Sequence, residues 1–374
     1  MKLRWSVMAV LGSLASVAQA QSSVTLYGAI DGGVLYQNTS AATLSPTAKN
    51  TGSVFEYKDG GIFASLWGIR GTEDLGGGYR VNFELQGVFN SGTGKLGLGD
   101  TAGVGTLFNQ QASVGISGPF GRFDAGRQYA PIIYAMADTD VRAAQYFGSI
   151  LSAWLGVNQA AGWPGTSSNA PLGAVYDSNA LVYQSPKFYG ASVSLEYAPG
   201  GVAGQIQGGT RESAVLKYSN YGLNFAAVYY NAHDTNPTAT SVATGLDNNR
   251  YYYLGAQYTF RGLSVSGSYS LARDPSDTSR VNYEILSAGF GYRFNPFFKI
   301  TSGYYYLKDR NIAENHSGLF AVGAEYNLSK RTLLYAQLGY VDNKGTMNQG
   351  IVFGTPVAPG AATTAAMIGM RQNF

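Results

Sequence analysis

The chain of 374 residues contains no cysteine and only two histidines, His233 and His316. The lack of cysteine excludes a disulfide framework, a thiol nucleophile and a cysteine metal site. The two histidines lie far apart in polar, loop-like stretches, so they do not form the close pair that a metal site needs. There is also no G-x-S-x-G motif to present a serine nucleophile. These absences predict a protein that is not an enzyme and that has neither a metal site nor a cofactor.

Charge is also scarce, and neither sign prevails. Only 13% of the residues are charged, with 25 lysines and arginines against 22 aspartates and glutamates. A nucleic-acid-binding protein of this size would show a basic excess or a basic stripe. The near balance therefore argues against nucleic acid as a partner.

Long apolar runs are the third absence. No stretch reaches the 18 or so apolar residues that a membrane-spanning helix requires. Nevertheless 45% of the residues are hydrophobic, and 50 glycines occur together with 28 tyrosines and 18 phenylalanines. A chain rich in both glycine and aromatic residues is typical of a closed β-sheet whose outer surface meets a lipid–water interface.

The N-terminus has the pattern of an export signal. Lys2 and Arg4 precede a short apolar run, which ends at the small-residue site Ala18-Gln19-Ala20. The run is too short to anchor the chain in a membrane but fits a cleavable secretory signal. We therefore predict a signal peptide over residues 1–20 and one β-barrel domain over residues 21–374.

Alternation with a period of two is the main positive signal. From Leu263 to Ser270, apolar or small residues at odd positions alternate with four serines at even positions. Such alternation predicts β-strands with one apolar and one polar face. Sixteen segments of this kind are expected, at about 24–34, 62–70, 79–89, 107–116, 122–128, 175–185, 191–197, 213–219, 223–230, 251–260, 263–271, 284–294, 297–307, 318–328, 331–340 and 365–374.

The connections between these segments distinguish a membrane barrel from a soluble sandwich. Short links such as Arg261-Gly262 and Asn295-Pro296 alternate with long polar stretches such as 231–250 and 341–364. Short turns at one end and long loops at the other are typical of outer-membrane barrels. The fold expected is thus an all-β, 16-stranded antiparallel transmembrane barrel. Its polar face should enclose water, and its apolar face should contact lipid.

Longer segments resemble a known family. The segments in question are SSVTLYGAIDGGV at 22–34, LWGIRGTEDLGGGYRVNFELQG at 66–87, FNQQASVGISGPFGRFDAGRQ at 108–128, SNALVYQSPKFYGASVSLEY at 178–197, LSKRTLLYAQLGYVDN at 328–343 and the terminal GMRQNF at 369–374. In this order they are similar to strands of the general diffusion porins of Gram-negative outer membranes, especially the β-proteobacterial branch.

The resemblance implies a homotrimer in the outer membrane with one water-filled pore per subunit. Ions and small hydrophilic solutes would diffuse passively through each pore, and lipid and lipopolysaccharide would surround the trimer. It also implies that the barrel-assembly machinery reads the terminal Phe374. The third loop, here about 129–174, would fold inward and narrow the pore. Because it is the longest connection in the chain, it is the one expected to have a function of its own.

Ion selectivity would be set where that loop faces the barrel wall. The loop offers Asp138, Asp140 and Arg142 as constriction residues, although either aspartate could instead cap a short helix. On the wall, neutral residues stand where the family has a basic row. These are Leu66, Gln110 and Tyr176.

Other charges are expected on the lumen face nearer the periplasmic end. Alternation places Arg70, Arg80 and Glu84 there. Because the basic row is missing, we expect a pore that is less anion-selective than its relatives, and nearly neutral or mildly cation-selective.

Three alternatives remain. A channel for a neutral solute such as a sugar could use the aromatic faces of Tyr176, Trp154 and Trp163. An outer-membrane enzyme is a second alternative, but this sequence shows no recognisable catalytic residues. An adhesin, the third, would show similar strands but no permeable lumen.

Small residues expected on the outside of the first five strands would support the trimer, since they allow close packing. They are Gly28, Gly32, Ser65, Ser113 and Gly115.

Overall fold

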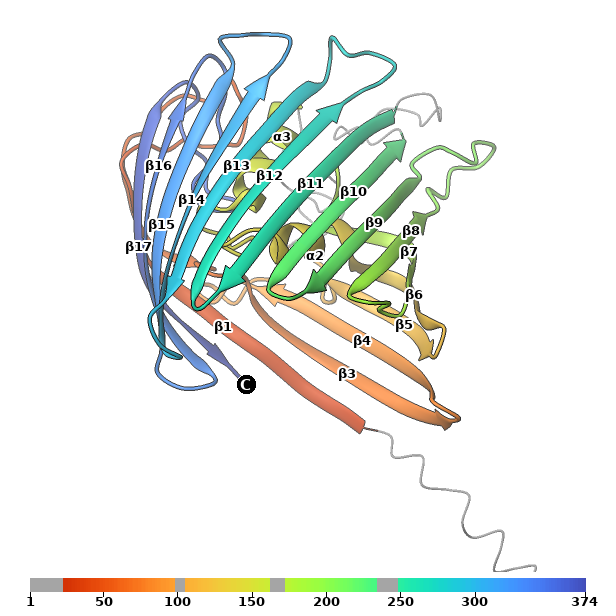
Figure 1. Ribbon diagram of the computed structural model, residues 1–374. Helices are drawn as coiled ribbons and strands as arrows, with labels where there is room; N and C mark the ends of the chain where they lie inside the picture. The colour runs from red at the N-terminus through yellow and green to blue at the C-terminus, as the bar shows by residue number, and fades with distance from the viewer. Residues whose placement is uncertain (1–22, 98–104, 162–171, 234–247) are drawn as a thin grey trace, which may run out of the picture.

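The computed structural model describes residues 23–97, 105–161, 172–233 and 248–374. The predicted signal peptide lies outside these residues. Strands tilt around a closed wall, and the two helices that the described residues form lie inside it (Figure 1). The strands are β1 (Ser23–Gln37), β2 (Val54–Asp59), β3 (Ser65–Gly76), β4 (Tyr79–Phe89), β5 (Gln111–Gly118), β6 (Gly121–Tyr129), β7 (Tyr176–Gln184), β8 (Ala191–Ala198), β9 (Arg211–Asn220), β10 (Leu223–His233), β11 (Asn248–Phe260), β12 (Leu263–Arg273), β13 (Asn282–Arg293), β14 (Phe298–Asp309), β15 (His316–Asn327), β16 (Thr332–Asn343) and β17 (Ala362–Asn373). The helices are α2 (Pro131–Asp138) and α3 (Ile150–Ala160).

Every strand pairs antiparallel with its neighbours, and β17 returns to β1 to close the sheet. β2 and β3 occupy a single position, because they pair with successive halves of β1. The wall is therefore the 16-stranded antiparallel barrel that the alternation predicted. In the part of the chain that the structure describes, neither helix is long and apolar enough to cross a bilayer.

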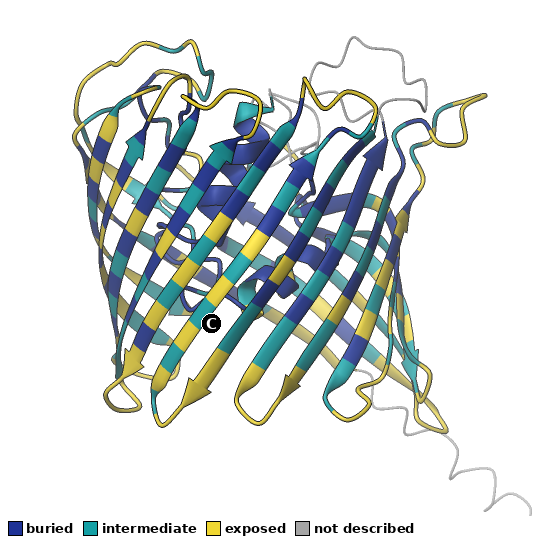
Figure 2. Cartoon of the chain, turned by 45° about the horizontal axis from the view of Figure 1, so that its top comes forward, coloured by how far each residue is buried: buried dark blue, intermediate teal, exposed yellow. Residues whose placement is uncertain are grey.

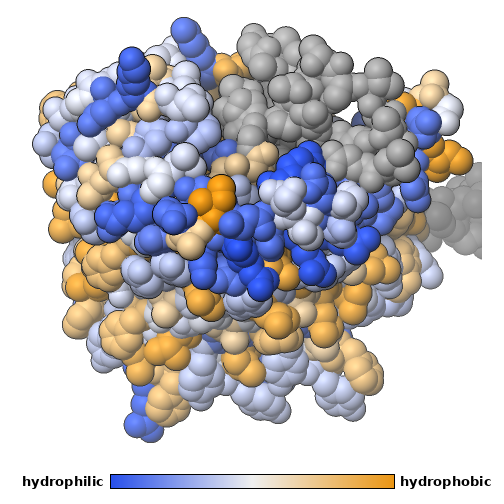
Figure 3. Space-filling view, turned by 90° about the horizontal axis from the view of Figure 1, so that it is seen from above, coloured by the Kyte–Doolittle hydropathy of each residue, from blue (hydrophilic) through white to orange (hydrophobic). Residues whose placement is uncertain are grey.

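The two faces of the wall follow the period-two pattern. Leu254, Leu286, Phe290, Phe320 and Leu338 point outward, and about half of each side chain is exposed. Bands of exposed and buried residues alternate along the strands in Figure 2. Seen from the loop end, hydrophilic residues gather over the middle of the visible surface and apolar residues lie along its outer side (Figure 3). This distribution suits a barrel with lipid around it.

The second strand position departs from the expectation of one segment at 62–70. It is interrupted between β2 and β3, where residues 60–64 leave the ladder. The buried carboxylate of Asp31 accepts the backbone N–H groups of Gly61, Ile62 and Phe63 at 3.0–3.1 Å. Tyr335 and Arg371 also bind this carboxylate, at 2.9 and 3.2 Å. Asp31 thus supplies the acceptors that the broken ladder lacks.

Closure of the barrel brings the chain end against the first strand. Phe374 and Gly28 exchange two backbone hydrogen bonds, at 3.0 and 3.2 Å. A Cβ atom at Gly28 would lie 2.3 Å from the Phe374 ring and 2.7 Å from the Leu66 carbonyl oxygen. Only glycine leaves room here for the ring to lie against the strand.

The small residues expected on the outside fall on both faces. Val114 and Ile116 of β5 point outward, so the alternating Ser113 and Gly115 face inward. Ser65 is buried, and its hydroxyl lies within hydrogen-bond distance of the Asp31 carbonyl oxygen and the Asp59 carboxylate. The expectation of an outward Ser113 and Gly115 is therefore wrong, because it misjudged the phase of β5. Gly28 and Gly32 alternate with the exposed Ile30 and Val34 on the outer face.

Candidate pore constriction

The third loop enters the barrel and packs against one side of its wall. Pro131 starts α2, and Ser149 caps α3 by accepting the N–H of Leu151 at 3.1 Å. The α3 helix is almost entirely buried and lies beside β13 and β14. Trp154 at its centre donates to the carbonyl oxygen of Leu172 at 2.8 Å. Both helices therefore hold fixed positions inside the lumen.

The wall behind the loop is apolar on its inner face. Tyr251, Tyr253, Ile285, Tyr305 and Leu307 point inward from β11, β13 and β14 and are buried. They join the side chains of α2 and α3 in one hydrophobic core. The expectation of a uniformly polar inner face thus fails near the loop end of these strands, where protein fills the lumen.

The last long connection, at 344–361, fastens the third loop from above. Phe147 and Val352 form a β-bridge, and Gly148 donates to the Ile351 carbonyl oxygen at 2.8 Å. The rings of Tyr146 and Phe353 stack with centroids 4.4 Å apart. Two loops far apart in sequence therefore form one inner structure.

Arg142 is an anchor within this structure. Its side chain is fully buried and donates to the carbonyl oxygens of Phe147 and Gly148 at 2.8 and 2.5 Å. It also donates to Gln337 at 2.5 Å and to the carbonyl and hydroxyl oxygens of Thr301 at 3.3 Å. One guanidinium therefore ties the loop to β14 and β16.

Asp140 is also buried and is bound within the loop. Its carboxylate accepts the Tyr305 hydroxyl at 2.8 Å and the N–H groups of Ala144 and Ile150 at 3.2 and 3.3 Å. Burial raises the pKa of the Asp140 carboxyl above its usual range, and these hydrogen bonds act in the opposite direction. The water-facing position expected for Asp140 and Arg142 is thus not met, because protein atoms bind both charged groups.

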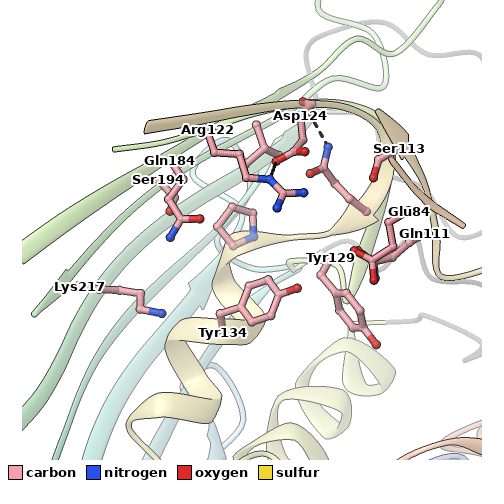
Figure 4. Close-up of a pocket in the computed structure, with 13 residues that line it drawn as sticks. Glu84, Gln111, Ser113, Arg122, Asp124, Tyr129, Tyr134, Gln184, Ser194 and Lys217 are labelled. Carbon is pink, nitrogen blue, oxygen red and sulfur yellow. Dashed lines mark hydrogen bonds and ion pairs between the residues drawn. The ribbon is translucent and has the colours of Figure 1, made fainter. Parts of the chain in front are cut away.

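Asp138 is the acidic loop residue that remains accessible. About half of its side chain is exposed, and it forms an ion pair with Lys217 of β9. Lys217 lines a polar cavity of about 310 Å³ between α2 and the wall. Figure 4 shows Lys217, Tyr134, Arg122 and Glu84 around this space. Arg122 pairs with Asp124 across 2.5 Å.

Sequence reasoning missed Arg122 and Lys217 as lumen residues. Each alternates with an outward apolar neighbour, Phe123 and Leu216, and this alternation would have revealed the inward direction. A second cavity of about 500 Å³ lies between Asp138 and strands β10 to β14. It contains Lys299, which pairs with Glu325 at 3.0 Å.

The neutral wall residues lie on neighbouring strands. Leu66 stands opposite Ala29 and Val88, on the face shared by Gly68 and Arg70. Gln110 and Tyr176 are buried against each other, and Gln110 donates to the Tyr176 hydroxyl at 2.5 Å. Neither offers a charge to the lumen.

The predicted lumen charges nearer the turns lie on that face too. Arg70 is opposite Glu84, and its guanidinium carbon lies 5.0 Å from the Tyr27 ring centroid. Tyr27 donates to Glu84 at 2.6 Å. Arg80 is largely exposed and is 3.9 Å from Asp74.

Comparison with known proteins identifies this architecture. The sequence matches the family described as Gram-negative porin over residues 6–346. The chain belongs to the Gram-negative porin family. It is similar to an outer membrane porin protein of Bordetella pertussis and to outer membrane porin protein 32 of Delftia acidovorans, each 28% identical over the full length of both chains. The major outer membrane protein P.IB of Neisseria gonorrhoeae is 28% identical over 95% of each chain.

Solved structures show the same fold. An anion-selective porin from Comamonas acidovorans superimposes with a TM-score of 0.76 and 24% identity, covering 95% of this chain and all of the other. The trimer form of OmpT from Vibrio cholerae gives 0.65 at 14% identity, covering 94% of this chain and 99% of that one. This porin is therefore a β-barrel of the Gram-negative outer membrane that forms a passive diffusion channel.

Proposed function

We propose that this porin is a weakly selective channel for small hydrophilic solutes, nearly neutral or mildly cation-selective. The pairing of lumen cations carries the proposal: of the four basic residues that line the two cavities, Arg122, Lys217 and Lys299 each lie against a carboxylate. Paired charges cancel much of each other's field, so little net positive potential remains to attract anions. The neutral Leu66, Gln110 and Tyr176 add no charge where a basic row would favour anions.

Reversal potentials across planar bilayers in a KCl gradient test this selectivity. The native porin should give a potential close to zero or slightly on the cation side. Leu66→Arg should shift the permeability ratio toward chloride by roughly threefold to tenfold, because an unpaired charge acts strongly beside low-dielectric walls. Leu66→Gln is the control, because it adds polarity without charge. A native channel that strongly prefers chloride would contradict the proposal.

A sugar-specific channel has less support. Trp154 is fully buried and only 2% of Tyr176 is exposed, so neither offers a ring face to a solute. Trp163 lies outside the described residues. Among the described aromatic residues of the third loop, Tyr134 does expose half of its side chain in the cavity of Figure 4. Graded sugars in liposome swelling should therefore enter by size alone, and saturable block of ion current by one sugar would favour the specific channel.

We further propose how the chain is exported and assembled. Residues 1–20 act as a signal peptide, and three copies assemble in the outer membrane among lipid and lipopolysaccharide. No catalytic role is assigned.

Phe374 is proposed as the signal for the barrel-assembly machinery. Deleting Phe374 should lower the amount of assembled barrel in the outer membrane by about tenfold. The lost hydrogen bonds to Gly28 are worth only about 1 kcal/mol each, which is too little to unfold the barrel. Refolding in detergent should therefore be nearly normal, and Phe374→Tyr should assemble. Normal assembly of the deletion variant in cells would contradict this role.

A further inference from the structure

Two arginines face each other on the outer surface of the barrel. Arg250 of β11 and Arg273 of β12 are directly opposite in the antiparallel register. They share the outward face with Tyr252 and the exposed Leu254, while Tyr251 between them points inward and is buried. Like charges directly opposite in a sheet destabilise it unless an anion lies between or above them.

The two guanidinium groups have no counterion among the described residues. Neither forms an ion pair there, and the Nε atom of each is buried without an acceptor. The amide oxygen of Asn231, opposite Arg250, is also unpartnered. Glu212 on the same row is opposite Asn231 and is therefore two strands away from Arg250. By contrast, Arg310 on the same side of the barrel lies 3.7 Å from Glu284.

An aromatic pair and an apolar groove continue from the arginines toward the middle of the wall. The Arg273 guanidinium lies 5.8 Å from the Tyr252 ring centroid, and the Tyr252 and Tyr229 rings are 5.5 Å apart. Both tyrosines line a groove of about 440 Å³ on the outer face. Its other lining residues are almost all apolar, and they include Val193, Ala214, Leu216, Ala227 and Leu254.

The order along the strands matches an amphiphile with an anionic head. The arginines stand at the loop end, because β11 begins and β12 ends there, and the groove lies where acyl chains would be. Each arginine can donate two parallel N–H bonds to a phosphate. Two facing arginines therefore bind a phosphate better than a single point charge would.

We propose that Arg250 and Arg273 bind a phosphate of the lipid A part of lipopolysaccharide, with one acyl chain in the groove beside Tyr229 and Tyr252. The inference rests on the outer-membrane position of the barrel and names a site for the lipid partner proposed above. It does not depend on ion selectivity.

Binding of defined lipids to the full-length porin in detergent tests the site. The probes are bisphosphorylated lipid A, the same lipid without phosphate, and inorganic phosphate, with binding followed by native mass spectrometry. Arg250→Gln combined with Arg273→Gln should lower the affinity for bisphosphorylated lipid A by at least about tenfold, since it removes the charge-assisted hydrogen bonds of both arginines to the phosphate. Arg310→Gln, which removes a paired arginine, should bind like the native chain.

Two further arms separate the phosphate from the acyl chain. Leu254→Asn should weaken the binding of lipid A with and without phosphate by a similar factor, because it changes the groove for the acyl chain and leaves the arginines in place. Inorganic phosphate should compete poorly, because it lacks an acyl chain. Unchanged affinity in the double variant would overturn the proposal, as would equal competition by inorganic phosphate. Loss of the trimer with lipid affinity retained would overturn it as well, since the face would then be a contact between copies. Native single-channel conductance in the double variant verifies that the barrel is folded.

Discussion

Replacing Arg142 by methionine should release the third loop and give a wider, noisier channel. Methionine fills part of the volume but leaves the carbonyl oxygens of Phe147, Gly148 and Thr301 without their donor. Removing one partner from a buried charged network costs about 3–5 kcal/mol. That energy is comparable to the difference between a docked and a displaced loop, so displaced states should become populated.

Single-channel recordings and liposome swelling measure the effect. We expect larger and fluctuating conductance steps and faster entry of larger sugars. Arg80→Met is the matched control, because Arg80 is exposed and its distance to Asp74 is 3.9 Å. A quiet channel of native conductance in Arg142→Met would show that the loop is held without this guanidinium.

Asp31→Ala should produce the largest loss of barrel stability. Its carboxylate accepts three backbone N–H groups, the Tyr335 hydroxyl and Arg371, and all of them would lose that acceptor in a buried place. We expect a cost of about 3–5 kcal/mol, observed as a lower temperature at which the barrel loses its compact form on SDS gels.

A second substitution sharpens this test. Arg371→Met added to Asp31→Ala should recover part of the loss, because it removes the charge that the first substitution leaves largely buried without a counterion. Asp74→Ala, on an exposed residue, should leave the transition temperature nearly unchanged. Equal temperatures for Asp31→Ala and the native barrel would refute the role assigned to Asp31.

The wall could be predicted from the sequence because successive residues of a strand point to opposite faces, so that the polarity of each residue indicates its side. Leu263, Val265 and Tyr269 alternate with serines, and the structure places them outward in that order. The break at residues 60–64 could not be predicted in the same way. It is stabilised by Asp31 on another strand, and no local pattern around Gly60 and Gly61 announces that partner.

The packing of the third loop inside the barrel is even less predictable from the sequence. Alternation cannot distinguish a tyrosine that faces lipid, such as Tyr252, from one that faces a helix inside the barrel, such as Tyr253. The charges of Asp140 and Arg142 favoured a place in the pore, yet some of their hydrogen-bond partners come from strands more than 150 residues away. The inward direction of Lys217 does follow from alternation with the outward Leu216, but its pairing with Asp138 depends on where the third loop lies.

The bridge between Phe147 and Val352 bears on the order in which the channel matures. More than half of the chain separates the two partners, so α3 cannot reach its final place before β16, β17 and the connection between them have formed. The same hairpin carries β17, which seals the wall against β1. Closure of the barrel and docking of the third loop should therefore coincide, so that no assembly intermediate contains a pore of the final width.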